Sequence, residues 1–398
     1  MSVLRDEPEL AYELWTKIRH LNFTEQQKHQ LDYELGIVCY YLDKKQEGFE
    51  ALNRVALSNS ELAYEAACNM YWYLEPIPVK MWKRLNTQVP VGYRCMNPSI
   101  VRYKSGYLVN LRASNYAIID GHYFAIDSNN IINNLNYIQY LDRDLNVQWT
   151  KPLDNIDITY PINAYGLEDI RLTEQLMFTC NSRNNHPYGV PRVSIGIITD
   201  LESSPVKFKL QHQPSPDGNT ECEKNWLLMR SSSRARSPDK MIKNSCYLYD
   251  PFTLVDKGKV YSINKLGHLR CSAGPIWYKN GLLFLVHELA MKENDRIYTH
   301  RLCHWKRSDQ SETNDWKRSD QSEMKESTYT ISLPFFFHHR GIEYAMSICW
   351  YRGNFLVSMG LRDGQAWLAE IERKEVDKLL RNGTEYRCSV KVTQVSRS

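Results

Sequence analysis

The sequence lacks the features that mark membrane, secreted and nucleic-acid-binding proteins. No apolar stretch approaches the roughly 18 residues of a membrane span, so we expect no transmembrane helix. The segment from Met1 to Glu7 already carries charged side chains, which argues against a signal peptide. The formal net charge is only +4, too small to indicate binding to nucleic acid or to a membrane surface. We therefore expect a cytoplasmic protein.

Several catalytic and metal-binding motifs are also missing. The ten cysteines are dispersed and form no Cys-x-x-Cys pair, which argues against a zinc ribbon or a redox motif. The absence of Gly-x-Gly-x-x-Gly, Walker A and Gly-x-Ser-x-Gly removes support for dinucleotide, P-loop and serine-hydrolase classes. Asp142-Arg143-Asp144 has the spacing of the metal-binding Asp-x-Asp of nucleotide-sugar transferases, but its neighbours favour a hairpin turn. We expect neither a cofactor nor a metal.

Aromatic residues, in contrast, are abundant, with 26 Tyr and 10 Trp among 398 residues. Aromatic side chains favour β-strands. Their ring faces also pack against the apolar C–H face of a sugar, although most of them should lie in the core or on sheet surfaces. A chain of this length predicts one large domain accompanied by a smaller one.

Residues 1–85 have the pattern of a small α-helical region. Thr24-Glu25-Gln26-Gln27 is a capping-box sequence. It precedes apolar residues at helical spacing, namely Leu31, Leu35, Val38 and Leu42. Consecutive short helices of this kind resemble tetratricopeptide hairpins, which either contact a protein partner or cover a neighbouring domain. Pro76-Ile77-Pro78 ends the helical region, because proline cannot sit inside a helix.

From residue 86 to residue 398 the pattern changes to short strands separated by Gly, Asn, Asp and Pro. Polar clusters recur beside these strands in five blocks: Asn97-Pro98-Ser99, Glu168-Asp169-Ile170-Arg171, Glu223-Lys224-Asn225-Trp226, Arg270-Cys271-Ser272 and Ile342-Glu343-Tyr344. Five similar blocks predict five blades around a common axis, with the first strand of each blade lining the channel. We therefore expect a mostly β protein, a five-bladed β-propeller with a short helix over residues 374–380.

The residue types in these blocks suit chemistry on sugars or phosphates. A carboxyl group donates a proton when burial or a like-charged neighbour raises its pKa. Glu168 and Asp169 are neighbours on a strand, so only one of them should face the channel. We expect Asp169 to be the general acid or base, with Glu168 supporting it. A salt bridge at the start of a strand would explain the same two residues without catalysis.

Candidates for substrate binding come from every block. The pair Asn225-Trp226 suits sugar hydroxyls and ring stacking, although the same pair fits a blade edge. Arginines and histidines suit a phosphate or diphosphate, because guanidinium binds it through two parallel hydrogen bonds. The expected substrate-binding residues are Asn97, Arg112, Asn115, Arg171, Glu223, Lys224, Asn225, Trp226, Arg270, His287, Glu288, Tyr298, His300, Arg301, Glu343 and Asp363.

Together these blocks resemble a known group of proteins. The blocks at Asn97–Ile100, Glu168–Arg171, Glu223–Trp226 and Tyr298–Arg301 resemble the five-bladed propeller domains of bacterial and giant-virus glycosyltransferases, which often follow tetratricopeptide-like helices. More distantly, the Asn-Pro and Glu-Asp-Ile-Arg blocks resemble mannoside phosphorylases and β-1,2-mannosyltransferases, in which Glu-Asp-Pro-Arg marks the active-site blade. The resemblance covers roughly residues 90–372.

The resemblance implies a carbohydrate-active enzyme, either a glycosyltransferase or a glycoside phosphorylase of mannoside type. Asp169 would be its general acid, and the arginines and histidines would hold phosphate or a nucleotide sugar. Ile170 replaces the proline of the phosphorylase motif, and Asn97 replaces the aspartate of hydrolase relatives, which weakens a two-carboxylate hydrolase mechanism. The alternative is a non-catalytic glycan-binding propeller whose helices bind a protein partner.

One segment of the chain is duplicated. Trp305–Glu312 recurs identically as Trp316–Glu323. An identical tandem copy in so polar a stretch predicts a tolerated insertion in a surface loop between two outer strands.

Overall fold

The computed structural model describes most of the chain. The described residues are 7–18, 20–119, 122–126, 130–156, 160, 164–184, 186–212, 223–229, 237–243, 245–256, 259–292, 295–307 and 326–394. Within these ranges, no helix combines the length and the apolar character needed to cross a membrane. The second copy of the duplicated segment lies outside the described residues.

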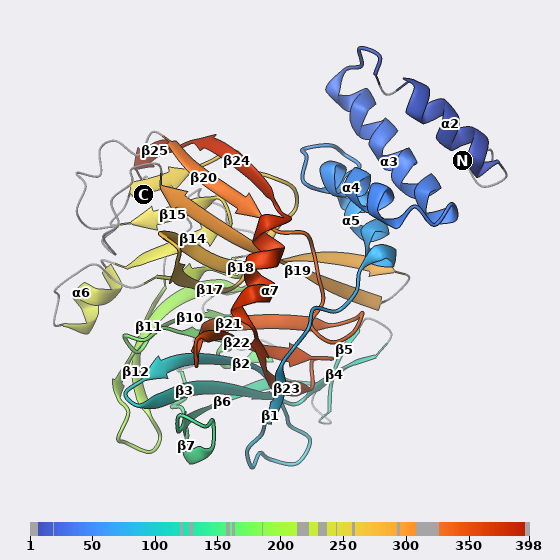
Figure 1. Cartoon of the computed structure of the whole chain (residues 1–398). Coiled ribbons are helices and arrows are strands. Elements are labelled where there is room, and N and C mark those ends of the chain that lie inside the picture. The colour runs from blue at the N-terminus through green and yellow to red at the C-terminus, as the bar shows by residue number, and fades with distance from the viewer. Residues whose placement is uncertain are drawn as a thin grey trace.

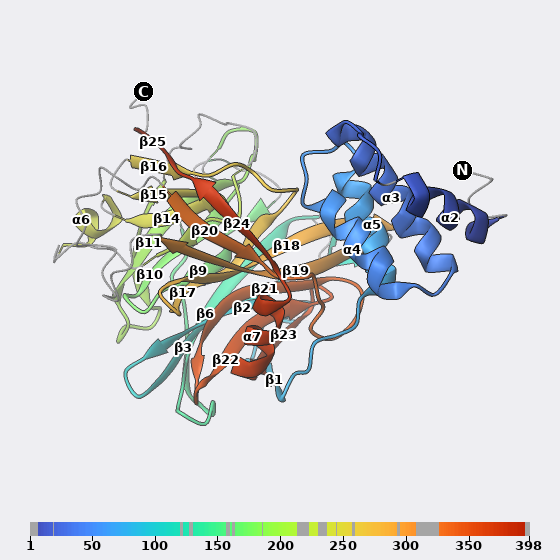
Figure 2. The same cartoon turned by 45° about the horizontal axis from the view of Figure 1, so that its top comes forward.

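Short helices form the N-terminal part of the chain, as the sequence pattern predicts. They are α2 (Pro8–Ile18), α3 (Glu25–Tyr41), α4 (Lys45–Ala56), α5 (Ala63–Met70) and the 3₁₀ helix η1 (Tyr71–Tyr73). The capping box at the start of α3 is confirmed: Gln27 N donates to Thr24 Oγ1 at 3.3 Å, and Thr24 N donates to Gln27 Oε1 at 3.0 Å. Figures 1 and 2 both show these helices beside the large β region.

The β region is a five-bladed propeller, so the predicted architecture is confirmed. Blade one contains β2 (Arg94–Tyr103), β3 (Gly106–Ser114), β6 (Ile132–Leu141) and β7 (Val147–Pro152), with β8 (Ala164–Tyr165) beside β6. Blade two contains β9 (Glu168–Leu172), β10 (Met177–Ser182), β11 (Arg192–Asp200) and β12 (Lys207–His212). Blade three contains β13 (Leu227–Leu228), β14 (Cys246–Asp250), β15 (Thr253–Asp256) and β16 (Lys259–Ser262).

The last two blades follow in chain order. Blade four contains β17 (Arg270–Tyr278), β18 (Gly281–Lys292), β19 (Asp295–Arg307) and β20 (Glu326–Ile331). Blade five contains β21 (Glu343–Tyr351), β22 (Asn354–Leu361) and β23 (Gln365–Ile371). Two short helices accompany the blades: α6 (Pro238–Lys243) lies within blade three, between β13 and β14, and α7 (Arg373–Arg381) follows blade five over the predicted range.

The ring is closed by strands from both ends of the chain. The N-terminal strand β1 (Met81–Leu85) pairs with β23 and supplies the outer strand of blade five. Near the C-terminus, β24 (Thr384–Ser389) pairs with β20 and β25 (Lys391–Gln394) pairs with β16, which adds a strand to blades four and three. Because β1 pairs within blade five, the propeller uses a strand that precedes residue 86.

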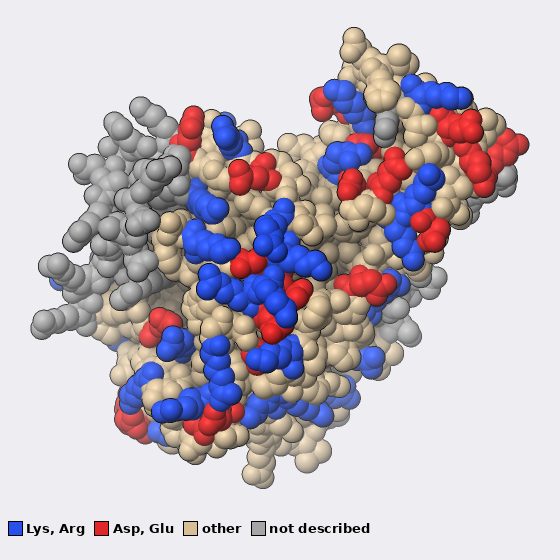
Figure 3. Space-filling model, in the orientation of Figure 1, with Lys and Arg blue, Asp and Glu red and all other residues tan. Residues whose placement is uncertain are grey.

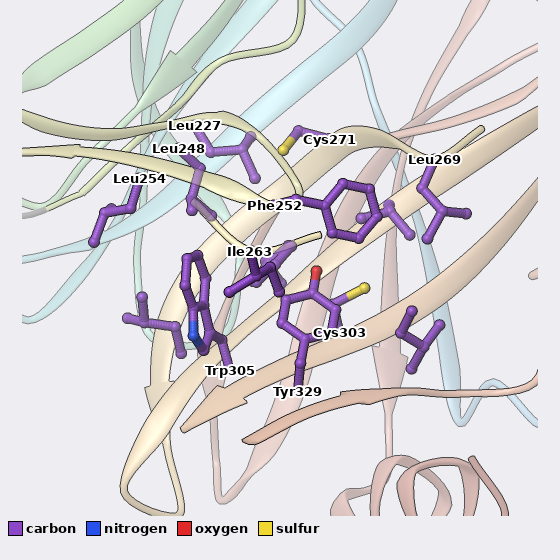
Figure 4. Packing of buried hydrophobic residues seen from close by; sticks show 14 of the residues in the cluster. Leu227, Leu248, Phe252, Leu254, Ile263, Leu269, Cys271, Cys303, Trp305 and Tyr329 are labelled. Atoms are coloured by element: carbon purple, nitrogen blue, oxygen red, sulfur yellow. The ribbon is translucent and has the colours of Figure 1, made fainter. Parts of the chain in front are cut away.

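Each blade packs on both of its faces. Along β18, Leu282, Phe284 and Val286 pack into the cluster shared with blade three, whereas Leu283 and Leu285 pack into the cluster shared with blade five. Successive strand residues point to opposite faces, so one apolar run serves two interfaces. Among the described residues, such a cluster lies between every pair of neighbouring blades. Figure 4 shows the one between blades three and four.

The helices share a core with blade four. Leu52 and Val55 of α4 and Met70 of α5 cluster with Ala290 of β18 and Ile297 of β19. Full burial of an aliphatic side chain contributes roughly 1.5–3 kcal/mol, so this cluster holds the helices firmly on the propeller. In Figures 1 and 2, α4 and α5 accordingly stand next to β18 and β19.

Serine side chains tie the innermost strands together around the propeller axis. Ser99 Oγ of β2 accepts from Leu172 N of β9 at 3.0 Å, and Ser347 Oγ of β21 accepts from Ile100 N of β2 at 2.6 Å. Ser272 Oγ of β17 donates to the carbonyl of Ala345 in β21 at 2.6 Å. These bonds fix the inner strands relative to one another, and therefore also fix the polar residues at their starts.

Candidate active site

Three blades place a polar residue with unusual backbone geometry at the start of the inner strand. Asn97, Asp169 and Asn225 have φ angles of 43°, 50° and 65°. Few residues other than glycine adopt this left-handed region, and asparagine and aspartate tolerate it best. The ladder register of β2 and of β9 is interrupted at the same point. Backbone strain of this kind often accompanies functional sites, so these three positions mark a candidate site.

Asp169 lies between an amide and a guanidinium. Its Oδ1 accepts from Asn97 Nδ2 at 3.1 Å and from Arg112 Nη1 at 2.9 Å, and its side chain keeps 16% of its surface exposed. Burial works to raise the pKa of Asp169, but Arg112, Arg171, the Asn97 amide and Lys224 together lower it below its ordinary value. The free protein therefore holds Asp169 as a carboxylate that ligands can still reach.

Arg112 comes from the second strand of blade one and is nearly fully buried. Its Nε donates to Asn134 Oδ1 at 2.9 Å, which orients the guanidinium towards Asp169. Asn134 is itself held, since its Nδ2 donates to the carbonyl of Tyr165 at 2.9 Å. Glu168 lies on the other side, with Oε2 at 3.9 Å from Arg112 Nη2 and Oε1 at 3.8 Å from Arg183 Nε. Asp169 and Glu168 thus share Arg112, while Asp169 also accepts from Asn97 and Glu168 also lies near Arg183.

Arg171 crosses from blade two to three other blades. Its Nε donates to the carbonyl of Ser272 in blade four at 3.1 Å. Its Nη2 donates to Asn225 Oδ1 before blade three at 3.2 Å and to the Tyr344 hydroxyl of blade five at 2.6 Å. Tyr344 also donates to Asn225, and burial raises the pKa of Tyr344 above its ordinary value. Tyr344 is therefore a neutral donor beside a fixed cation.

His287 adds an unpaired nitrogen to this group. Its ring lies 5.2 Å from that of Tyr344 and 5.6 Å from that of Tyr298, centroid to centroid. Burial, followed by the charges of His300, Arg270 and Arg171, lowers the pKa of His287 well below its ordinary value. Within the described structure, Nδ1 of this buried imidazole has no hydrogen-bond partner. An unpaired buried polar atom costs roughly 1–3 kcal/mol, so any group that reached this nitrogen would recover that cost.

Asp363 joins the group from the turn between β22 and β23. Burial, helped by the charge of Asp169, raises its pKa to about 6, although Arg112, Arg296 and Tyr116 act in the opposite direction. Its φ angle of 44° is again left-handed. We call these residues the axial cluster: Asn97, Arg112, Asp169, Arg171, Asn225, His287, Tyr344 and Asp363. Its two aspartates have pKa values shifted in opposite directions, the pattern that separates acid from base in many active sites.

Three neighbours of Asp363 are not among the site residues predicted from the sequence. Tyr116 and Tyr123 come from the hairpin β4 (Tyr116–Ile119) and β5 (His122–Ala125), and Arg296 comes from β19. Arg296 Nη1 donates to the Tyr123 hydroxyl at 2.7 Å. A turn signal was available, because Asp120-Gly121 sits between two short apolar runs and favours a hairpin.

Some predicted site residues have partners elsewhere in the fold. Glu223 accepts from Val193 N at 3.0 Å and lies 3.6 Å from Arg192 Nη1. Trp226 stacks on Tyr247 at 4.9 Å between blades two and three. Asn115 bridges the carbonyl of Ile131 at 2.9 Å and the amide of Asn133 at 2.7 Å.

Two further predicted residues, Lys224 and Arg270, are exposed but lie near the site. Lys224 lowers the pKa of Asp169, and Arg270 is the cross-strand neighbour of His287.

A second group of predicted residues lies at the joint with the helices. Glu288 Oε2 accepts from Arg301 Nε at 2.8 Å, and Arg301 Nη1 donates to Asn53 Oδ1 of α4 at 2.7 Å. His300 packs against Phe335 and Phe337, and burial lowers its pKa to about 3. Here the structure brings α4 and blade four together.

Glu343 anchors the loop before β21. It accepts the backbone amides of Phe337, His338 and His339 at 2.9, 2.7 and 2.8 Å. Among the described residues, Glu343, His338 and His339 form the group whose ligand atoms lie close enough for a metal. However, Arg362 Nε donates to His339 Nε2 at 3.3 Å, so the proton of His339 belongs on Nδ1, which lies 2.8 Å from His338 Nδ1. Both imidazole rings thus already form hydrogen bonds, and we propose no metal site here.

Comparison with known proteins gives structural neighbours only. No family model and no curated protein matches the sequence. The β-1,2-mannobiose phosphorylase from Listeria innocua, in complex with β-1,2-mannobiose, is 13% identical over 74% of this chain and 95% of its own, with a TM-score of 0.43. A glycosyl hydrolase from Bacteroides ovatus is 12% identical over 71% of this chain and 84% of its own, with a TM-score of 0.42. At such low sequence identities and TM-scores, structural likeness alone assigns no activity. A proposed function therefore has to be argued from the residues of the site.

Proposed function

We propose that this chain is a carbohydrate-active enzyme that makes or phosphorolyses glycosidic bonds at the axial cluster. It would be a glycosyltransferase or a glycoside phosphorylase of mannoside type, with Asp169 as general acid. The opposed pKa shifts of Asp169 and Asp363, two carboxyl groups beside the same buried arginine, carry this proposal. Transfer of a sugar requires a proton donor for one glycosidic oxygen, and coupled carboxyl groups supply one near neutral pH.

Asp169 and Asp363 interact, so they titrate as a pair that holds one proton near pH 6. In the free protein this proton resides mainly on Asp363, because Arg112 and Arg171 hold Asp169 ionised. An anionic substrate beside Arg171 and Lys224 would offset their positive charge and raise the pKa of Asp169. Substrate binding would thereby move the proton to the residue that the sequence motif marks as the acid.

The cations of the cluster suit a phosphate or a nucleotide sugar. Arg171 is fixed by groups from blades two to five, so its guanidinium is already oriented before a ligand binds. Lys224 and Arg270 are exposed beside it, and His287 offers the unpaired Nδ1. A sugar 1-phosphate or a nucleotide sugar would pair its phosphate with these cations and place its sugar next to Asp169.

A second candidate function is glycan binding without chemistry. It is favoured by the lowered pKa of Asp169 and its ion pair with Arg112, which also fit a purely structural carboxylate. In that case the helical region would bind a protein partner in the manner of tetratricopeptide hairpins. The exposed apolar residues Leu10 and Leu14 of α2 offer it a contact surface.

Product formation separates the two functions. Purified protein is incubated with sugar 1-phosphates and nucleotide sugars plus simple acceptors, beside Asp169→Asn, Asp363→Asn and the control Asp144→Asn. Asp144 pairs with Arg352 on the surface, so it controls for the loss of one carboxylate. We expect an oligosaccharide product from the wild type and the control, and none from Asp169→Asn. No product from any donor, with glycan binding that survives Asp169→Asn, would leave the binding function.

A further inference from the structure

The β4–β5 hairpin has two different faces. It interrupts blade one after β3 and forms a sheet of its own, with Ile118 paired to Tyr123 and Ala117 paired to Phe124. Because strand residues alternate, Ile118 and Tyr123 share a face with Tyr116, and Ala117 shares the opposite face with Phe124. The rings of Tyr116 and Tyr123 lie 5.2 Å apart, which confirms that one face carries both tyrosines.

The tyrosine face points towards the axial cluster. Tyr116 lies close enough to Asp363 to lower the pKa of that carboxyl group, the Arg112 guanidinium lies 5.9 Å from the centroid of the Tyr116 ring, and Arg296 of blade four donates to the Tyr123 hydroxyl at 2.7 Å. Burial raises the pKa of Tyr123, and the charge of Asp363 raises it further, so Tyr123 lies within electrostatic reach of that carboxyl group. The hairpin therefore extends from blade one to blade four alongside Asp363.

Tyr123 nevertheless keeps much of its ring in solvent. The residue is 46% exposed, although its hydroxyl is fixed by Arg296. A ring that is held at one end and open at its side offers a flat apolar surface at little entropic cost. Arg296 and Asp363 supply a donor and an acceptor nearby. A pyranose needs this combination, because its C–H face stacks on a ring while its hydroxyls form hydrogen bonds.

We propose that Tyr123 and Arg296 form a binding subsite for a second sugar ring, next to the sugar that reacts at Asp169. The substrate or acceptor of this protein is then an oligosaccharide rather than a monosaccharide. This inference rests on the proposed function, since it places the second ring relative to the reacting one. It deepens that function by naming Tyr123 as a residue that determines specificity for chain length.

The hairpin offers a matched control for this subsite. Phe124 is adjacent to Tyr123 and 48% exposed, nearly the same as Tyr123, but lies on the opposite face. Affinity is measured by titration calorimetry with mannose, mannobiose and mannotriose and with the corresponding glucose series, for the wild type, Tyr123→Ala, Tyr123→Phe and Phe124→Ala. The same sugars then serve as acceptors in the product assay, which gives KM and kcat separately.

We expect the wild type to bind a disaccharide about tenfold more tightly than the monosaccharide, which corresponds to roughly 1.4 kcal/mol. Tyr123→Ala should abolish this gain and raise KM for disaccharides more than it raises KM for the monosaccharide. Tyr123→Phe should retain most of the gain because the ring remains, and Phe124→Ala should behave as the wild type.

The other outcomes are informative as well. Equal affinity for all chain lengths, or an equal loss in Tyr123→Ala and Phe124→Ala, would overturn the subsite while leaving the proposed function intact. If no sugar of any length binds or reacts, both the subsite and the proposed function fail.

Discussion

Two arginine–carboxylate pairs from the same predicted set of site residues differ in their surroundings. Arg301 and Glu288, at the joint with the helices, are 0% and 7% exposed, and Asn53 of α4 completes their contact. Arg112 and Asp169, at the propeller axis, are 5% and 16% exposed. Asp169 also has a left-handed backbone and lies near further cations. The first pair is enclosed by protein, whereas the second remains accessible to a ligand.

This difference in exposure and surrounding charge indicates whether an ion pair stabilises the fold or can take part in binding and catalysis. A pair sealed between two elements stabilises their contact only if neither charge is lost, since an uncompensated buried charge is costly. A pair that keeps one oxygen near solvent, with excess positive charge around it, can exchange partners with an incoming anion.

The largest effect is expected from Asp169→Asn. The amide cannot donate or accept the proton that sugar transfer requires, so turnover should fall by roughly 10²–10⁴-fold. Because asparagine preserves the shape of the side chain, thermal unfolding should change much less than activity. Initial rates together with a melting curve measure both. Full activity in this variant would remove Asp169 from the mechanism.

Glu288→Gln should show the reverse behaviour. The substitution leaves Arg301 buried without its counter-charge, which destabilises a protein by roughly 3–5 kcal/mol. Urea unfolding monitored by tryptophan fluorescence measures the loss, and the rate per folded molecule should stay near that of the wild type. An unchanged unfolding midpoint combined with lost activity would place Glu288 in the active site instead.

The pH dependence of stability should separate the two aspartates of the axial cluster. The pKa of Asp363 is raised from 3.8 to about 6, so its contribution is complete below pH 4 and is lost as the pH rises through 6. Asp169 has the opposite sign: its lowered pKa adds stability above about pH 4 that is lost in acid. As the pH rises from 4.5 to 7.5, the free energy of unfolding of Asp363→Asn should therefore increase by about 1–3 kcal/mol relative to that of the wild type. Urea unfolding at several pH values tests this, and parallel curves would contradict the shift.

The smallest effect is expected from a third pair, Arg352 with Asp144, whose side chains are 59% and 55% exposed. Asp144→Asn should change the free energy of unfolding by about 0–1 kcal/mol, because water screens exposed charges. Exposed ion pairs of this kind also occur on the face that includes α7, where Figure 3 shows charged side chains of both signs side by side. On this face Lys374 Nζ lies 2.7 Å from Glu372 Oε2. A loss above 2 kcal/mol would show that exposure alone does not distinguish the pairs.

The propeller could be predicted because the polar blocks mark the starts of the inner strands. The block at Asn97 lies near the start of β2, and the blocks at Asp169, Asn225, Arg270 and Glu343 precede or open β9, β13, β17 and β21. It was harder to predict which residues inside the blocks face the propeller axis. Neighbouring strand residues point to opposite faces, so the answer depends on the exact register of the strand. His287 and Glu288 are neighbours, yet one faces Tyr344 and the other pairs with Arg301. No local pattern indicates which of the two faces the axis.

The rest of the site depends on contacts between distant segments. Asp363 acquires its raised pKa from burial beside Asp169, nearly 200 residues earlier in the chain, and from nothing in its own turn. Arg296 and Tyr123 are likewise 173 residues apart. Such contacts follow from closure of the ring. The sequence predicted the ring, but not which outer loops and hairpins fold back over its axis.

The most direct test of the account is a crystal structure of the protein soaked with mannose 1-phosphate. We predict that the phosphate contacts Arg171, Lys224 or His287 and that the sugar lies within hydrogen-bond distance of the Asp169 carboxyl group. A sugar bound away from Asp169, or an axial cluster that stays empty at saturating ligand, would contradict the assignment of this cluster as the active site.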